Sequence, residues 1–329
     1  MSKKYHVAVV GASGVVGRKV IQVLEERQFP VSELSLFASS RSAGQKIPFN
    51  GEEITIQELT EDALTAPIQI AIFSAGGETS KHFAPIASSN GITVIDNSSA
   101  WRMDKNIPLV VPEVNAGVLS KDDKLIANPN CSTIQSVVPL KPLQENYGIK
   151  RVVYSTYQAV SGAGRKGIDD LEQGTTSTFP YEINKTVIPQ IDVFLDNGNT
   201  KEEQKMIDET RKILGVENLP VSATAVRVPI KTSHGVSINI ELEKEFDIKK
   251  IREEIGNIDG VILADNPETL DYPLQSVAED TDNVYVGRIR RDDSVENGIN
   301  LFVVADNLRK GAATNSVQIA ESLIARGII

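Results

Sequence analysis

The stretch Asn128-Pro129-Asn130-Cys131-Ser132-Thr133 contains the single cysteine of the 329-residue chain. Leu125-Ile126-Ala127 ahead of it predicts the end of a buried strand, and apolar residues at helical spacing behind it predict a helix. Cys131 would then lie in the first turn of that helix, where unpaired backbone N–H groups and the helix dipole favour an anion. Because such a position lowers a thiol pKa from ~8.5 into the ~3.5–7.5 range, Cys131 is a candidate thiolate nucleophile.

A lone cysteine can also be an inert core residue that packs as a small hydrophobic side chain. Pro129 and the asparagines on either side of it build a shaped polar loop ahead of Cys131. A cysteine that served packing alone would need no such loop, so the sequence favours the nucleophile.

A thiolate that attacks a carbonyl needs a proton donor and acceptor within hydrogen-bond reach, and the chain has three histidines. His6 falls inside a predicted first strand, where we expect a structural role. His82 falls early on a predicted helix, where we expect it at the surface. His234 falls in the polar stretch Lys231-Thr232-Ser233-His234-Gly235, which predicts a loop between two strands. His234 is therefore the favoured partner of Cys131.

Four other polar side chains stand in apolar or turn contexts. Gln158 ends a predicted apolar strand and precedes a glycine-rich loop, so its amide could orient a substrate carbonyl or the thiol, or could be a plain strand-edge residue. Arg102, Arg227 and Lys205 could each bind an anion or be a surface charge.

A glycine-rich turn, Gly11-Ala12-Ser13-Gly14-Val15-Val16-Gly17, follows a predicted buried strand at Tyr5–Val10 and precedes a predicted helix. Its three glycines form a variant of the dinucleotide-binding fingerprint, in which glycine allows a tight turn and a close approach of backbone to pyrophosphate. Glycines can also serve packing alone. The strand before the turn and the helix after it favour nucleotide binding.

The next strand, Leu34–Ala38, ends in Ser39-Ser40-Arg41-Ser42, where an NAD-specific protein would carry an acidic residue. Hydroxyls and an arginine suit a 2′-phosphate, so NADP is favoured, although Arg41 could be an exposed arginine without a ligand. Ser74 and Asn97 follow two further predicted strands, at Gln69–Ser74 and Thr93–Ile95. Their position predicts the ligand-binding edge of an open α/β sheet.

These elements predict a doubly wound α/β domain followed by a strand-rich domain. The second half contains predicted strands at Val152–Val160, Val221–Pro229, Val236–Leu242, Val284–Arg290 and Asn300–Ala305, with a turn at Asn297-Gly298 between the last two. Helices are predicted at Arg165–Gln173, Lys201–Leu214 and from Gly311 to about Arg326, the last packing back on the first domain. We therefore expect a nucleotide domain of residues 1–129 plus 310–329 and a second domain of residues 130–309, with a mixed or antiparallel sheet.

The amino-acid composition limits the kinds of partner and the cellular location that we expect for the chain. With 34 basic and 44 acidic residues the net charge is −10, which disfavours nucleic acid and anionic membranes as partners but leaves room for a local anion pocket. A single cysteine allows no internal disulfide and fits a reducing compartment. The sequence shows no membrane-length apolar run, no signal peptide and no metal-ligand spacing near His234. We expect a cytoplasmic protein without a metal.

Taken together, Gly11–Gly17, Asn128–Cys131, Gln158–Gly162, Arg227-Val228-Pro229 and His234 resemble the aspartate-semialdehyde dehydrogenase family in order and in spacing. The resemblance runs from Val7 to the terminal helix with Asn315. It implies a Rossmann-type NADP domain followed by a mixed-sheet α+β catalytic domain that forms a homodimer. It also implies reductive dephosphorylation of 4-phospho-L-aspartate by NADPH, giving L-aspartate 4-semialdehyde and phosphate. That reaction belongs to the aspartate route to lysine and diaminopimelate, methionine and threonine.

The resemblance also assigns roles to residues. Cys131 would form the acyl-thioester, His234 would be the acid/base, and Gln158 would position the intermediate. The substrate carboxylate would bind Arg227, its ammonium Glu202 or the neighbouring Glu203, and the phosphate Arg102 and Lys205. The implied NADP contacts are Ser13, Gly14, Val15, Val16, Arg41, Ser42, Ser161, Gly162 and Asn315, to which the predicted ligand edge adds Gly11, Ser39, Ser74 and Asn97.

Three alternatives stay open. N-acetylglutamyl-phosphate reductases share the plan, but they carry a Pro-Gly-Cys-Tyr type of motif that Pro129-Asn130-Cys131-Ser132 does not match. A glyceraldehyde-phosphate dehydrogenase would show Ser-Cys-Thr-Thr and an acidic residue after the second strand, and both are missing. The chain could also be a non-catalytic NADP-sensing module, against which its cysteine, histidine and arginines argue.

Overall fold

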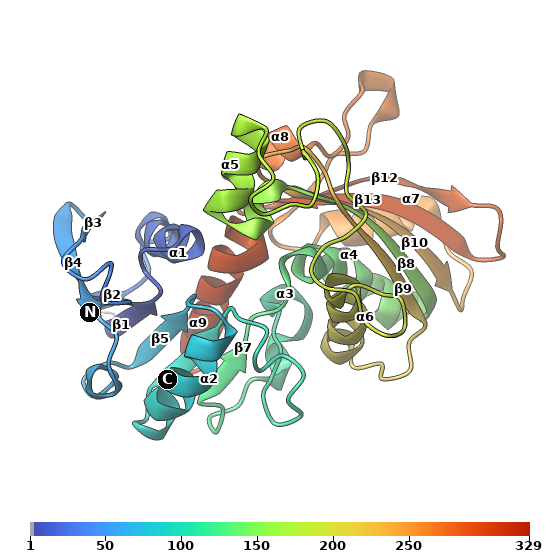
Figure 1. Cartoon of the computed structure of the whole chain (residues 1–329). Coiled ribbons are helices and arrows are strands. Elements are labelled where there is room, and N and C mark those ends of the chain that lie inside the picture. The colour runs from blue at the N-terminus through green and yellow to red at the C-terminus, as the bar shows by residue number, and fades with distance from the viewer. Residues whose placement is uncertain (1–2) are drawn as a thin grey trace. The chain divides into compact units, whose positions relative to one another are not determined.

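The computed structural model describes residues 3–329 and divides them into two compact units. One unit runs as far as Pro129 and includes Ala312–Ile329, and the other is Asn130–Gly311. Each unit is built on a single sheet, of seven strands in the first and six in the second (Figure 1).

The first unit contains a twisted, largely parallel sheet. Its strands are β1 (Tyr5–Val10), β2 (Val31–Ala38), β3 (Lys46–Phe49), β4 (Glu52–Glu58), β5 (Ile70–Phe73), β6 (Thr93–Asp96) and β7 (Leu125–Ala127), in the order β3-β4-β2-β1-β5-β6-β7. The β3–β4 pair is antiparallel, and the other neighbours are parallel. This order confirms the predicted doubly wound fold, in which β1 is buried along its whole length.

Helices cover both faces of this sheet. The helices of the unit are α1 (Val15–Glu26), α2 (Gly77–Ser89), α3 (Pro112–Asn115) and α9 (Thr314–Ala325), with short 3₁₀ turns at Glu61–Ala63 and Ala116–Val118. On one face, Leu24 of α1 and Leu323 of α9 share a hydrophobic core with the strands. Arg27, the C-cap of α1, donates two hydrogen bonds of 2.9 and 2.7 Å to Glu321 of α9. The C-terminal helix therefore completes the core of the N-terminal sheet.

The turn between β1 and α1 needs its glycines. Gly11 has a φ of +86°, and a Cβ there would lie 2.4 Å from the carbonyl oxygen of Ser74. A Cβ on Gly17 would lie 2.2 Å from the carbonyl oxygen of Gly11, so α1 can pack on the strand only without a side chain at that position. The N-cap of α1 is Gly14, which supplies no side-chain hydrogen bond, so the first N–H groups of the helix receive no side-chain cap.

The second unit contains a mixed sheet, as the sequence predicts. Its strands are β8 (Ile149–Gln158), β9 (Val221–Arg227), β10 (His234–Leu242), β11 (Val261–Leu263), β12 (Val284–Asp292) and β13 (Gly298–Ala305), in the order β11-β12-β13-β10-β8-β9. The β8–β9 and β11–β12 pairs are parallel, and the others are antiparallel. Several predicted strand bounds differ from the structure by two or three residues. β8 ends at Gln158 because a 3₁₀ turn at Val160–Ala163 follows, and Gly298 already belongs to β13, so residues 293–297 make the connection.

Three helices, α4 (Cys131–Tyr147), α6 (Lys201–Leu214) and α7 (Ile248–Gly256), pack on this sheet. The unit also contains the shorter α5 (Arg165–Gln173) and α8 (Gln275–Ala278) and a 3₁₀ turn at Pro267–Thr269. A π-helical turn at Arg309–Ala313 spans the boundary between the two units in the chain. Side chains of β8 alternate, so that Tyr154 is buried whereas Tyr157 is 42% exposed. One face of the sheet therefore carries the core, and the other keeps exposed side chains such as that of Tyr157.

A capping box holds the start of α6 in place. The Thr200 hydroxyl accepts a hydrogen bond from the Glu203 N–H, and the Glu203 carboxylate accepts one from the Thr200 N–H at 2.6 Å. Glu203 also accepts a hydrogen bond from the N–H of Ala225 in β9 at 2.9 Å. The first turn of α6 is thereby joined to the edge of the sheet.

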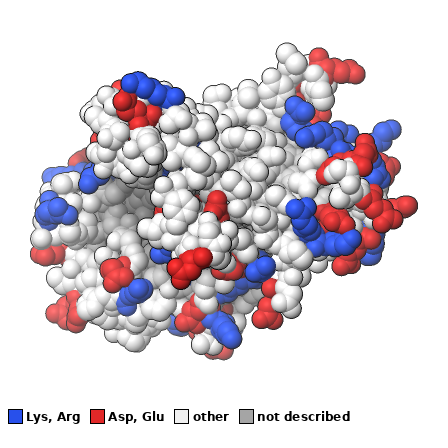
Figure 2. All heavy atoms as spheres, turned by 45° about the vertical axis from the view of Figure 1, so that its right-hand side comes forward, with Lys and Arg blue, Asp and Glu red and all other residues white. Residues whose placement is uncertain are grey.

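Acidic and basic side chains are intermixed on the face of the molecule shown in Figure 2, where blue and red lie close together. Ion pairs at the surface include Lys150–Glu241 and Lys231–Glu172. In residues 3–329, no helix is both long enough and apolar enough to cross a membrane.

Candidate active site

Cys131 is the first residue of α4, so it lies in the first helical turn as the sequence predicts. The preceding Asn130 is the N-cap, and its Oδ1 accepts hydrogen bonds from the N–H groups of Ser132 and Thr133 at 3.0 and 3.3 Å. The cap fixes the direction of the first turn. Cys131 itself is partly exposed to solvent.

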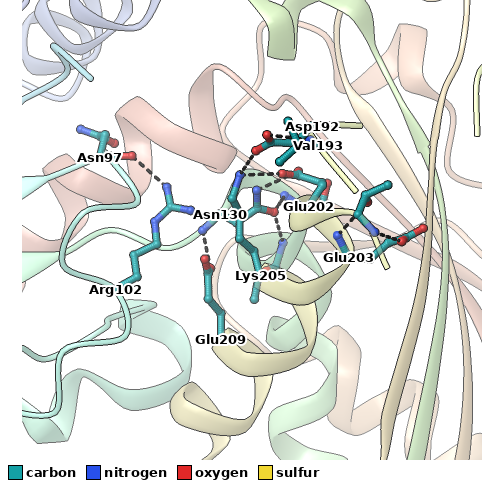
Figure 3. Close-up of polar contacts among 12 residues, drawn as sticks. Asn97, Arg102, Asn130, Asp192, Val193, Glu202, Glu203, Lys205 and Glu209 are labelled. Carbon is teal, nitrogen blue, oxygen red and sulfur yellow. Dashed lines mark hydrogen bonds and ion pairs between the residues drawn. The ribbon is translucent and has the colours of Figure 1, made fainter. Parts of the chain in front are cut away.

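Two carboxylates of α6 hold Asn130 from the other side (Figure 3). Its backbone N–H donates to Glu209 Oε2 at 2.6 Å, and its Nδ2 donates to Glu202 Oε1 at 2.8 Å. Glu202 and Glu209 are both less than 10% exposed. Asn130 therefore joins α6 to the helix that carries the cysteine.

Lys205 lies beside Glu202 on α6. Its Nζ donates to Glu202 Oε2 at 3.2 Å and to Asp192 Oδ2 at 3.0 Å (Figure 3). Burial lowers the pKa of Lys205, but the negative charges of Glu202 and Asp192 outweigh it and raise that pKa above the usual value. Lys205 is accordingly a cation paired with two carboxylates.

Gln158 and Arg227 are the last residues of β8 and β9 and stand opposite each other in the parallel register. Their side chains are buried, with exposures of 1% and 5%. Arg227 Nη1 donates to the carbonyl oxygen of Ala159 at 2.7 Å, and the Phe179 ring centroid lies 5.8 Å from Arg227 Cζ. Burial lowers the pKa of Arg227, whereas the charges of Glu202 and Cys131 raise it, so Arg227 and Cys131 interact electrostatically.

The placement of His234 in a loop was wrong, because His234 is the first residue of β10 and is fully buried. It pairs with Ala305 of β13, so the pairing between β10 and β13 reaches into the stretch that was predicted to be a loop. The turn lies just before it, at Ser233, whose φ is +69°. A buried histidine at a strand end is held more firmly than a loop histidine would be.

The hydrogen bonds of His234 assign its tautomer. Its Nδ1 accepts a hydrogen bond from the Ala159 N–H at 3.0 Å, which places the ring proton on Nε2. Burial and the nearby charge of Arg227 hold the pKa of His234 well below its ordinary value. His234 is therefore a neutral imidazole that presents an N–H from Nε2.

Gly162 lies where Arg227 and His234 meet. A Cβ on Gly162 would lie 2.8 Å from Arg227 Nη1 and 3.5 Å from His234 Nε2. Next to it, the Ser161 hydroxyl exchanges hydrogen bonds with the Asn307 amide at 3.1 and 2.9 Å. A side chain at position 162 would displace the arginine, so glycine is required there.

Three buried nitrogen atoms near this point, Gln158 Nε2, Arg227 Nε and His234 Nε2, have no hydrogen-bond partner among the described residues. Buried donors are rarely left unpaired in proteins, because an unpaired donor costs about 1–3 kcal/mol. Three such donors beside a cysteine at a helix start suit a ligand that carries a carboxylate or a developing oxyanion.

The other two histidines lie elsewhere. His6 is buried in β1 with its Nε2 2.8 Å from Ser35 Oγ, and the exposed His82 pairs with Glu61 at 2.9 Å. Both therefore have the structural or surface position that the sequence predicts. No group of three or more His, Cys, Asp or Glu side chains in residues 3–329 could hold a metal ion.

In the first unit, Arg102 lies at the ends of β6 and β7. Its Nε donates to the carbonyl oxygen of Asn128 at 2.9 Å, and its Nη2 donates to that of Asn97 at 2.8 Å. Asn128 Nδ2 in turn donates to Asn97 Oδ1 at 2.9 Å, and Asn315 Nδ2 donates to Asn128 Oδ1 at 2.7 Å. These side chains form one buried network that joins α9 to the strand ends.

The predicted cofactor residues of the first unit lie on the loops that follow its strands. Gly11 and Ser74 follow β1 and β5, and the Ser74 N–H donates to the carbonyl oxygen of Val10 at 2.7 Å. Ser39 and Arg41 are exposed in the loop after β2, where Arg41 makes no ion pair within residues 3–329. The order of the sheet therefore brings these loops to one edge of the domain.

Sequence reasoning missed three buried residues around the cysteine and the histidine. Gln135 bonds to the backbone of His234, Asn307 accepts from the Ser233 N–H, and Gly311 leaves room beside Cys131. The one available signal was Gln135, a polar residue within the apolar stripe of α4 and one turn after Cys131.

Comparison with known proteins agrees with this geometry. Residues 6–121 match the family model described as "Semialdehyde dehydrogenase, NAD binding domain", and residues 140–310 match "Semialdehyde dehydrogenase, dimerisation domain". The aspartate-semialdehyde dehydrogenase of Aquifex aeolicus (strain VF5) is 53% identical over 338 residues, which cover 99% of each chain. That of Bacillus subtilis (strain 168) is 47% identical over 98% of each chain.

Solved structures show the same similarity. The aspartate semialdehyde dehydrogenase II of Vibrio cholerae, described as complexed with ASA, has a TM-score of 0.94 and 45% identity over 98% of this chain and 99% of that one. The Candida albicans enzyme, described as a structure with NADP, has a TM-score of 0.77 and 26% identity over 99% of this chain and all of that one.

The position of Cys131 predicts a thiolate. We expect half-maximal alkylation of Cys131 at a pH below ~8.5, the value of a model thiol, and the signal is unambiguous because the chain has a single cysteine. Arg227→Gln should raise this midpoint because it removes a nearby positive charge. His234→Asn should leave it almost unchanged because the imidazole is neutral. A wild-type midpoint at or above ~8.5 would contradict the activation of Cys131.

Proposed function

Because the chain belongs to the aspartate-semialdehyde dehydrogenase family, we propose that it converts 4-phospho-L-aspartate to L-aspartate 4-semialdehyde and phosphate with NADPH. The observation that carries the proposal is the set of three unpaired buried donors, on Gln158, Arg227 and His234, in the unit where Cys131 begins α4. A reaction that forms an oxyanion on an acyl group bound to cysteine would use such donors. The product would feed amino-acid biosynthesis.

Cys131 is the proposed nucleophile. Its Sγ bonds to the acyl carbon as the carbon–oxygen bond to phosphate breaks, and the departing phosphate takes up one proton from water. The thioester so formed is less prone to hydrolysis than the acyl phosphate. When bound, NADPH supplies the hydride that reduces the thioester carbon. The carbon–sulfur bond then breaks, which releases the aldehyde and restores the Cys131 thiolate.

His234 and the helix start stabilise the charge that develops on the acyl oxygen. The tautomer of His234 offers an N–H from Nε2, and the first turn of α4 offers backbone N–H groups. A neutral imidazole stabilises an oxyanion by donating this hydrogen bond and keeps its proton, because loss of the Nε2 proton would leave an imidazolate anion. Gln158, with its free Nε2, orients the same intermediate.

Arg227 is the proposed site for the α-carboxylate of the substrate. One of its nitrogens is already held by the carbonyl oxygen of Ala159, and Nε has no partner among the described residues. A guanidinium fixed in this way presents a planar fork to a carboxylate. Burial strengthens the interaction because little water competes for it.

Glu202 is the proposed contact of the substrate ammonium. The adjacent Glu203 is a poorer candidate, because its carboxylate already receives the N–H groups of Thr200 and Ala225. Glu202 accepts from Asn130 and Lys205, and a carboxylate has lone pairs for a further donor. We assign the phosphate to the cations Arg102 and Lys205.

NADP is the proposed cofactor. The residues fit its pyrophosphate, because Gly11 adopts a positive φ that only glycine adopts readily and α1 starts without a side-chain cap. Ser13, Gly14, Val15 and Val16 would line this turn, and Ser39, Arg41 and Ser42 would meet the 2′-phosphate. Ser74 and Asn97 would add contacts to NADP at the ligand-binding edge of the sheet. Ser161, Gly162 and Asn315 are the remaining proposed contacts.

A homodimer is the proposed assembly. The family model that matches residues 140–310 is named a dimerisation domain. The six-stranded sheet carries exposed side chains on the face that its helices leave open, where Tyr157 and Phe302 have ring centroids 5.9 Å apart. A second copy that packs on this face would bury these rings.

Turnover is best tested in the reverse direction. Purified protein should reduce NADP when L-aspartate 4-semialdehyde and phosphate are both present, and omission of phosphate should abolish the reaction. Cys131→Ala should show no turnover while it retains NADP binding. Faster turnover with N-acetylglutamate semialdehyde or glyceraldehyde 3-phosphate would assign the chain to a different acyl-phosphate reduction.

We expect the preference for NADP over NAD to depend on Arg41. Arg41→Ala should weaken the binding of NADP by at least tenfold, since a hydrogen bond to a charged group contributes about 1.5–3 kcal/mol. The binding of NAD, which lacks the 2′-phosphate, should change little. Arg326→Ala, which removes an exposed arginine just after α9, is the control. Equal losses for NADP and NAD would mean that Arg41 does not meet the 2′-phosphate.

The two proposed anion sites should respond differently to substitution. In the phosphorylating direction, Arg227→Leu should raise KM for the semialdehyde, and Arg102→Leu should raise KM for phosphate, each at least tenfold. Arg227→Lys should already impair binding because a lysine cannot form the planar fork. Retained NADP binding and an unchanged unfolding midpoint would show that the variants fold. If both variants changed both constants alike, the sites would not be separate.

A further inference from the structure

Gln135 is a fully buried residue of α4 that lies one helical turn after Cys131. Its Nε2 donates two hydrogen bonds to main-chain carbonyls, one to His234 in β10 at 2.9 Å and one to Val303 in β13 at 3.2 Å. Residues four apart on a helix lie on the same face, so Cys131 and Gln135 share one face of α4. A single amide thus connects the helix of the cysteine to the backbone of the histidine.

Packing alone does not account for a glutamine at this position. The neighbours of Gln135 along α4 include Ile134, Val137 and Val138, all buried, and a methionine would fill a similar volume. A buried amide is unfavourable unless it is hydrogen-bonded, and Gln135 Oε1 has no partner among the described residues. The advantage of glutamine must therefore lie in the two bonds that Nε2 donates.

The other tethers of His234 come from different elements. Its Nδ1 is held by Ala159, which follows β8, and the Ser233 N–H donates to Asn307 Oδ1 at 2.9 Å. The Ser233 carbonyl accepts from Gln275 Nε2 of α8 at 3.0 Å. These bonds fix the orientation of the imidazole, but none of them comes from α4. Gln135 alone among these four partners belongs to the helix of Cys131.

We propose that Gln135 is a positioning residue that sets the separation between Cys131 and His234. The inference rests on the proposed function, in which these two side chains act on the same acyl group. A shift of about 1 Å between reacting groups can lower a rate about a hundredfold, so a tether at this point would affect turnover more than binding. Gln135 touches neither substrate nor cofactor in this proposal.

Two substitutions at Gln135 and one matched control test the proposal. Gln135→Met keeps the length of the side chain and removes both donors. Gln135→Glu keeps its shape and, when ionised, places a charge against two carbonyl oxygens. Gln144→Met makes the same change at the far end of α4, where Gln144 Oε1 accepts from the Ile149 N–H at 3.0 Å. The control variant therefore loses one hydrogen bond of the same helix, and this bond has no link to His234.

For both Gln135 variants, we expect kcat for the semialdehyde reaction to fall at least tenfold, with KM for semialdehyde and phosphate within about twofold of wild type. Gln144→Met should keep wild-type kcat. NADP binding should be unchanged in all three variants, which would show that the dinucleotide domain is intact.

A second measurement does not depend on turnover. The chain has three histidines, so the His234 imidazole nitrogens can be assigned by ¹⁵N NMR through comparison with His234→Asn. Gln135→Met should shift the His234 signals, whereas those of His6 and His82 should stay in place. A wild-type kcat together with unchanged His234 signals in Gln135→Met would overturn the proposal. Should wild-type protein fail to turn over the semialdehyde, the proposed function would fail, while the NMR comparison would still decide whether Gln135 holds His234.

Discussion

The hydrogen bonds of Asn130 determine where Cys131, the proposed nucleophile, lies. Its side-chain oxygen caps α4, its side-chain nitrogen bonds to Glu202, and its backbone N–H bonds to Glu209. Because each polar group of this one residue has a partner, the turn that ends at Cys131 has little freedom. The carboxylates come from α6, which is itself attached to β9 through Glu203 and Ala225. The position of the cysteine is thus determined by a helix far along the chain.

Burial determines the charge state of His234 and the strength of the charge interactions of Arg227. Low water access keeps His234 neutral, and it makes the charge of Arg227 effective on a neighbouring anion. The donors on Gln158, Arg227 and His234 have no hydrogen-bond partner among the described residues. A bound carboxylate and a developing oxyanion would satisfy them. Donors fixed in place before a ligand binds are the feature by which a preorganised site lowers a barrier.

Local patterns allowed much of this arrangement to be predicted from the sequence. The glycine turn after β1 and the helix that begins at Cys131 follow from residue type and hydrophobic spacing. His234 was misplaced in a loop, because strand pairing with Ala305 is a tertiary effect that a polar stretch does not reveal. Gln135 was missed for a similar reason: its partners are carbonyls of strands more than ninety residues away. Contacts between distant segments leave little trace in a single sequence.

The space around the reacting groups depends on two residues that have no side chain. A Cβ on Gly162 would lie 2.8 Å from Arg227 Nη1, and a Cβ on Gly311 would lie 2.9 Å from the Cβ of Cys131. Neither glycine has the positive φ that would explain its presence through backbone conformation. Both are therefore required by what lies next to them. Gly311 belongs to the π-helical turn Arg309–Ala313, an irregularity that brings backbone close to the cysteine. The space around Cys131 and Arg227 is therefore shaped by close backbone approach at Gly311 and Gly162.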